Sequence, residues 1–167
     1  MKIYLGADHA GFELKEKIKS FLLGKNFETE DCGAFKFDKN DDYPDFISNV
    51  AQIVSRDPEN SRGIVVGGSG QAEMMLANKF KGVRCALFYN TAVPIKAADI
   101  TERISTNPYE IIRLTREHNN SNMLSIGARF VEDEKALNAV VQWLNEPFPG
   151  DKRHVRRINK IKELENK

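Results

Sequence analysis

The 167-residue chain has only two cysteines and no long apolar run. Cys32 and Cys85 lie in or beside strand-like segments with no close spacing, so we expect buried free thiols and neither a disulfide framework nor a metal site. No apolar segment approaches the roughly 20 residues of a membrane span, and none at the N-terminus resembles a signal peptide. The sequence therefore predicts no membrane association, with a cytoplasmic location as the default.

An excess of charge of either sign is also missing. The chain has 25 Lys and Arg against 24 Asp and Glu, a formal net charge of +1. This balance favours neither nucleic acid nor a membrane surface as a partner. Residues 150–162 depart from it, with six Lys or Arg and one histidine against one acid. Arg153 and Arg157, spaced i, i+4, would share a helix face that binds an anion or is simply solvated.

Short β-rich segments alternate with helical periodicity along the chain. Strands are predicted over residues 2–7, 27–32, 63–66, 83–89 and 123–126, each followed by a helical apolar pattern. Strands separated by helices imply right-handed crossovers and a parallel sheet covered on both faces. We therefore predict a single doubly wound, Rossmann-like α/β domain over residues 1–150, with five parallel strands. Ligands of such sheets bind beyond the carboxyl ends of the strands.

A turn of small residues, 67–73, joins the third predicted strand to a helix. Because Gly67, Gly68 and Gly70 lack Cβ atoms, the backbone can approach a ligand closely, and the N–H groups of the next helix point back at it. Glu73 is unusual there, since a phosphate loop does not need a carboxylate, whereas proton transfer on a bound anion needs a base. The alternative is a first-turn helix acid favoured by the macrodipole.

Polar side chains follow three of the predicted strands directly. Asp8-His9 follows the first strand, the glycine turn the third and Gly127-Ala128-Arg129 the fifth, so they should share one rim. The other histidines, His118 and His154, also have polar neighbours. Each histidine could have a surface or capping role, and His118-Asn119-Asn120 could end a helix, since Asn tolerates the left-handed conformation. Together with the glycine turn and the basic segment 150–162, the histidines favour a small phosphorylated ligand.

Seven segments, in order over nearly the whole chain, resemble the type B ribose-5-phosphate isomerases and their galactose-6-phosphate isomerase relatives. The segments are residues 6–11, 42–44, 67–70, 77–79, 116–120, 127–129 and 153–157. The resemblance implies a cofactor-free and metal-free interconversion of D-ribose 5-phosphate and D-ribulose 5-phosphate. It also implies a homodimer, or a dimer of dimers, with active sites between subunits and with the basic C-terminal helix, 151–167, reaching the partner's site.

The family has two branches, which differ in the catalytic base. One branch has a cysteine where this chain has Gly67, and the other a glutamate six residues on, as Glu73 is here. By this resemblance Glu73 is the base, His118 opens the sugar ring and Ser69 relays a proton. The substrate-binding positions that the resemblance and the turn imply are Asp8, His9, Gly68, Ser69, Gly70, Gln71, Ala72, Asn119, Arg129, Arg153 and Arg157.

The chain departs from the family pattern at residues 90–106, where the family usually has almost nothing. Ala97, Ile100 and Ile104 are spaced i, i+3, i+7, which predicts a short amphipathic helix behind Pro94. The insertion leaves the carboxyl end of a strand, so we expect it on the active-site side. Two alternatives therefore stay open: an isomerase of a six-carbon substrate such as galactose 6-phosphate or allose 6-phosphate, and a sugar-phosphate binding module without turnover.

Overall fold

A five-stranded parallel sheet forms the centre of the computed structural model, which describes residues 1–167. The strands are β1 Lys2–Ala7, β2 Thr29–Asp31, β3 Ser61–Gly67, β4 Cys85–Phe88 and β5 Met123–Gly127. They lie in the order β2-β1-β3-β5-β4, and every neighbouring pair is parallel. The predicted doubly wound α/β fold is confirmed. β2 and β4 are shorter than the predicted strands over 27–32 and 83–89.

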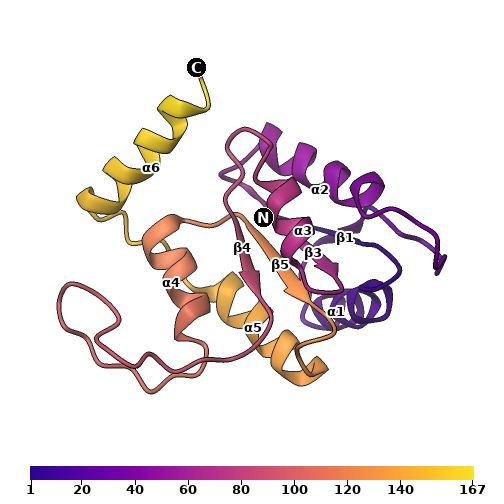
Figure 1. The fold of residues 1–167 in the computed structure, drawn as a ribbon, viewed down its shortest axis with the longest axis horizontal. Helices are drawn as coiled ribbons and strands as arrows, with labels where there is room; N and C mark the ends of the chain where they lie inside the picture. The colour runs from indigo at the N-terminus through magenta and orange to yellow at the C-terminus, as the bar shows by residue number, and fades with distance from the viewer.

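The chain has six helices, of which the first five lie against the sheet while the last projects from it (Figure 1): α1 Phe12–Gly24, α2 Pro44–Arg56, α3 Gln71–Ala77, α4 Glu110–Asn119, α5 Asp133–Asn145 and α6 Lys152–Leu164. The apolar sides of α1, α4 and α5 pack on one face of the sheet, and those of α2 and α3 on the other. Along β3, Ile64 and Val66 enter the first core and Val65 the second, which is the alternation of a strand buried on both faces. None of the helices combines the length and the apolarity needed to cross a bilayer.

The ends of the helices follow local sequence signals. α2 begins at Pro44, whose missing N–H costs nothing in a first turn. α4 ends at Asn119, and Asn120 takes the left-handed conformation with φ 45°, as the Asn pair predicted.

Both cysteines are free thiols, Cys85 buried and Cys32 half-buried. Burial raises the pKa of Cys32 to about 11, so this thiol is protonated and unreactive at neutral pH.

The helix predicted within residues 90–106 is wrong, because that segment is an irregular loop. Ile95, Ile100 and Ile104 are 98%, 74% and 77% exposed, so they find no apolar surface within the chain to stabilise a helix. Asp99 Oδ1 instead accepts hydrogen bonds from the backbone N–H and the hydroxyl of Thr101, at 2.8 and 2.6 Å. Such side-chain bonds to the backbone compete with helical ones and favour a turn.

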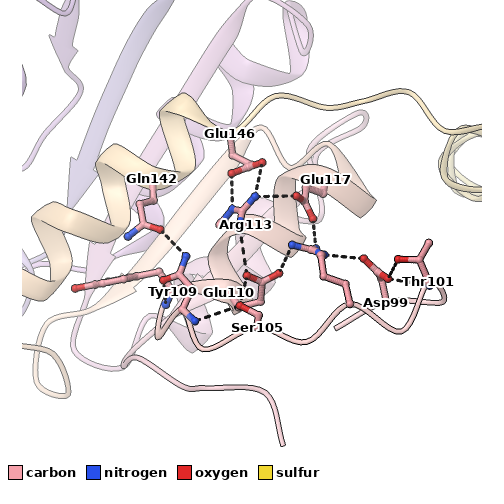
Figure 2. Close-up of polar contacts among 11 residues, drawn as sticks. Asp99, Thr101, Ser105, Tyr109, Glu110, Arg113, Glu117, Gln142 and Glu146 are labelled. Carbon is pink, nitrogen blue, oxygen red and sulfur yellow. Dashed lines mark hydrogen bonds and ion pairs between the residues drawn. The ribbon is translucent and has the colours of Figure 1, made fainter. Parts of the chain in front are cut away.

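Ion pairs fasten this loop to α4 (Figure 2). Three nitrogens of Arg103 lie 2.8, 2.8 and 2.6 Å from carboxylate oxygens of Asp99, Glu110 and Glu117. The side chain of Glu110 is fully buried. On α4, Arg113 continues the network to Glu117 and to Glu146, just beyond α5. Charge therefore places the insertion where apolar packing does not.

We expect Arg103→Ala to lower the free energy of unfolding by about 1–3 kcal/mol, because the buried carboxylate of Glu110 loses a charged partner. Urea denaturation measures this change. Lys96→Ala is the matched control, since Lys96 is an exposed cation of the same loop without an ion pair. Equal stability of the two variants would show that the network does not stabilise the fold.

Candidate active site

The glycine turn after β3 is fixed to the end of β5. The carbonyls of Gly67 and Gly68 accept hydrogen bonds from the N–H groups of Ala128 and Arg129, at 2.9 and 3.0 Å. Gly70 has φ 73°, a left-handed conformation that glycine adopts without strain. The carbonyl of Gly70 accepts a further bond from the hydroxyl of Ser125 at 2.7 Å. These contacts hold the turn rigidly at the carboxyl edge of the sheet, where α3 begins.

Glu73, in the first turn of α3, is folded back against the glycine turn. Its residue exposure is 4%, and its Oε2 atom is buried without a hydrogen-bond partner. A Cβ added to Gly67 would lie 1.9 Å from Oε1, so the carboxylate fills the space that a side chain at residue 67 would need. Burial raises the pKa of Glu73, and the negative charge of Asp8 adds to the increase. A buried carboxylate with a free oxygen and a raised pKa suits a general base.

Asp8 and His9, at the end of β1, lie on the same edge. Asp8 Oδ1 accepts hydrogen bonds from the N–H groups of Ala10 and Gly11, at 3.0 and 3.2 Å. His9 is held by Asp41, whose Oδ1 lies 2.7 Å from Nδ1 of the ring and accepts from the His9 backbone N–H at 2.9 Å. This hydrogen bond raises the pKa of His9, and the ring is oriented with Nε2 as its free nitrogen.

Sequence reasoning missed Asp41. It lies in a loop 32 positions from His9, next to the recognised segment 42–44, and no periodic pattern marks it. Asp8, His9 and Asp41 are also the one group in the chain with three potential metal-ligand atoms within 4.8 Å of one another. The 2.7 Å contact between His9 and Asp41 is a hydrogen-bond distance, so this arrangement is an ion pair that orients His9.

Arg129 completes this edge of the sheet. Its guanidinium lies beside the turn, where a Cβ on Gly68 would be 3.3 Å from Cζ. Ser69, Gln71, Tyr89 and Phe130 line a hollow of about 230 Å³ next to it. The predicted residues at the strand ends therefore do come together. We call Asp8, His9, Ser69, Glu73 and Arg129 the rim cluster.

A second set of predicted residues lies at the opposite edge of the sheet. α4 runs back from the loop after β4, and its end meets the start of that strand: Arg84 Nε donates to the carbonyls of Asn119 and Asn120 at 3.0 Å. The imidazole of His118 stacks on that of His154, with ring centroids 4.3 Å apart. We call His118, Asn119, Arg153 and Arg157 the helix cluster.

The rim and helix clusters do not meet within one chain. α6, which carries both arginines, packs against α4 and extends away from the sheet (Figure 1). Ile158 of this helix is buried, whereas Val155, Ile161 and Leu164 are 36%, 49% and 64% exposed. Burial lowers the pKa of His118, and the charges of Arg153 and Arg157 lower it further. The helix cluster is therefore a positively charged site with an imidazole that is neutral near pH 7.

We expect Asp41→Asn to lower the pKa of His9. Because that pKa is raised in the fold, the ion pair stabilises the protein fully below the ordinary histidine value of about 6.5 and loses its effect as the pH rises through the folded value. The variant should therefore lose more stability near pH 6 than near pH 9. NMR titration of His9 and denaturation at both pH values test this, with exposed Asp42→Asn as the control. An unchanged His9 titration would contradict the assignment.

Comparison with known proteins identifies the family. A family model described as Ribose/Galactose Isomerase matches residues 3–161. A protein named ribose-5-phosphate isomerase B from Mycobacterium leprae is 40% identical over 165 residues, which cover 99% of this chain and 90% of that protein.

Solved structures agree with this match. A ribose-5-phosphate isomerase B from Mycoplasma genitalium, with bound ribulose-5-phosphate, has a TM-score of 0.86 at 36% identity and covers 99% of this chain and 97% of its own. The ribose-5-phosphate isomerase B from Clostridium thermocellum has a TM-score of 0.83 at 37% identity, and the match covers 99% of this chain and 98% of that one. The chain therefore belongs to the Ribose/Galactose Isomerase family and is an aldose–ketose isomerase.

Proposed function

We propose that the protein interconverts D-ribose 5-phosphate and D-ribulose 5-phosphate through a cis-enediol intermediate, with Glu73 as the base. The observation that carries this proposal is the buried carboxylate of Glu73, whose Oε2 has no partner and which lies against the glycine turn. In the cysteine branch of the family the base side chain belongs to the residue at position 67. Here the Glu73 carboxylate occupies that space, which supports the glutamate branch.

The reaction begins with opening of the furanose ring, because the C2 proton becomes acidic only beside a free C1 carbonyl. His118, neutral near pH 7, accepts the proton of the anomeric hydroxyl and returns a proton to the ring oxygen. Asp8 holds sugar hydroxyls. Glu73 then removes the C2 proton and delivers it to C1, while Ser69 relays a proton between O1 and O2. Backbone N–H groups of residues 68–72 stabilise the negative charge that develops on the oxygens.

A composite site between two chains joins the two clusters. His118 and Glu73 lie at opposite edges of one sheet, so the mechanism needs the helix cluster of a partner at each rim cluster. A two-fold homodimer satisfies this requirement twice. The projecting α6, with exposed Ile161 and Leu164, supports residues 151–167 as the arm that crosses to the partner. Arg153 and Arg157 then bind the phosphate, together with Arg129 and His9 of the rim.

A six-carbon sugar phosphate is the second candidate substrate. A polar cavity of about 370 Å³ adjoins His118, and the 90–106 loop contributes Asp99 and Arg103 to its lining. At a composite site this cavity would give room for a longer sugar. Incubation with ribose 5-phosphate or allose 6-phosphate in deuterated water decides between them, because isomerisation introduces solvent deuterium into the product. If a sugar phosphate raises the melting temperature of the protein but is not turned over, the protein is a binding module.

We expect Glu73→Gln to reduce kcat for ribose 5-phosphate by at least about 10²–10⁴-fold, because an amide cannot accept the C2 proton. Binding of the sugar phosphate should change little, since Gln has nearly the same shape. Glu134→Gln is the matched control, because Glu134 is also a first-turn helix acid but is exposed on α5. If the Glu73 variant retained more than about a tenth of wild-type turnover, Glu73 could not be the general base.

His118→Ala should reduce turnover of ribose 5-phosphate much more than that of ribulose 5-phosphate, because the ketose is already linear. The expected difference is about 10²-fold, the lower end of the range for general acid–base catalysis. Initial rates are measured at low substrate, with the linear aldose product trapped as it forms. Equal losses for the two substrates would remove His118 from the ring-opening step.

Mixing two inactive variants tests the composite site. One chain carries Glu73→Gln, and the other carries Arg153→Ala and Arg157→Ala, which remove charge-assisted phosphate contacts of about 1.5–3 kcal/mol each. In a mixed dimer one site combines the lesions and the other has none, so random mixing should restore about a quarter of wild-type activity. Mixed dimers that form, as shown by mass spectrometry, and stay inactive would place both clusters in one chain's site.

A further inference from the structure

His154 is a buried titratable residue to which the proposed mechanism gives no task. It lies in the first turn of α6 and is only 5% exposed. Its imidazole is nearly parallel to that of His118, with an angle of 11° between the planes and 4.3 Å between the centroids. This contact joins the last turn of α4 to the first turn of α6.

His9 and His118, the two histidines to which the proposed function gives a role, are oriented in different ways. His9 is held by hydrogen bonds from its ring and backbone to Asp41. Neither His118 nor His154 makes a side-chain hydrogen bond, so no such bond sets the plane of either ring. The parallel stack against a buried partner limits rotation of His118, and it leaves both nitrogens at the edge of that ring free for a ligand.

The surroundings of the stacked imidazoles of His118 and His154 favour their neutral forms. The groups that face them are Asp99 and Arg103 of the 90–106 loop, Arg113 and Glu117 of α4, and Asp151, Arg153 and Arg157 at α6. Burial lowers the pKa of both imidazoles, and the neighbouring arginines lower it further, whereas Asp99 and Asp151 oppose the shift. Two stacked rings would repel each other if both were protonated, so the stack also favours the neutral imidazole.

We propose that His154 is a positioning residue, which holds the ring of His118 by stacking in the plane needed for proton transfer to and from the sugar ring. The proposal rests on the proposed role of His118 in ring opening. It assigns His154 no contact with the substrate. What the reaction requires of residue 154 is a flat, buried ring, and its own titration is not needed. A phenylalanine should therefore replace it, while an aliphatic side chain should not.

The kinetic test compares three substitutions at this position. His154→Ala removes the stack, and we expect kcat/KM for ribose 5-phosphate to fall about 10–100-fold, as for other displaced catalytic groups. The loss should lie in kcat, and ribulose 5-phosphate, assayed with the aldose trapped, should be affected by less than about threefold. His154→Phe keeps a flat ring and should retain activity toward both sugars. His154→Leu fills the buried space without a flat ring and should resemble His154→Ala, which covers the case in which the alanine variant fails to fold.

NMR provides a readout that does not depend on catalysis. In ¹⁵N-histidine-labelled protein, His154→Leu should shift and broaden the ring signals of His118, because the ring that limits its rotation is lost, whereas His154→Phe should keep them narrow. Lys160→Ala, an exposed change on the same helix, is the control and should leave the His118 signals unchanged. A His118 signal that is indifferent to residue 154 would overturn the proposal. So would equal loss with both sugars, or a His154→Phe variant as impaired as His154→Leu.

The two hypotheses fail in different experiments. If His118→Ala impairs both sugars equally, the ring-opening role is wrong, whatever happens at residue 154. If His118→Ala impairs the aldose selectively and His154→Leu does not, the ring-opening role stands and the positioning role of His154 is overturned.

Discussion

The active site depends on one steric constraint: the carboxylate of Glu73 occupies the space that a side chain at residue 67 would need. Glu73 can fold its carboxylate against the strand end only because residue 67 has no side chain, since a Cβ there would lie 1.9 Å from Oε1. This arrangement costs free energy, because the carboxylate of Glu73 is buried and its Oε2 atom has no hydrogen-bond partner. The turn that hosts it must therefore be held firmly, and the bonds from the β5 end to Gly67, Gly68 and Gly70 supply that rigidity.

A parallel sheet with helical crossovers has two edges, and this fold uses both. The strand ends gather the rim cluster at the carboxyl edge, while every helix that follows a strand carries its own last turn to the opposite edge. His118 lies at such a last turn and cannot reach Glu73 of its own chain. Under the proposed function, the geometry of the fold itself makes a second chain necessary, and α6 is the element free to extend toward it.

The 90–106 loop shows how charge can replace packing. Its isoleucines are exposed, yet Arg103 places three carboxylates around one guanidinium and ties the loop to α4 close to His118. A fork of fixed donors suits this task, because it can pair with several acids at once. The same helix end is in contact with His154 of α6. The last turn of α4 is thus supported from two sides, by the ion pairs of the loop and by the stacked ring.

The sequence by itself determined the strand order along the chain, the glycine turn, the helix end at Asn119 and the family resemblance, because local periodicity, turn chemistry and capping are written in neighbouring residues. The predicted helix over the insertion was wrong, since its spacing did not reveal that nothing would cover the apolar side. Only the tertiary structure decided that Asp41 holds His9, that His154 stacks on His118, and that the two clusters lie at opposite edges. These contacts join residues far apart in sequence, and their geometry depends on how the crossovers direct each helix across the sheet.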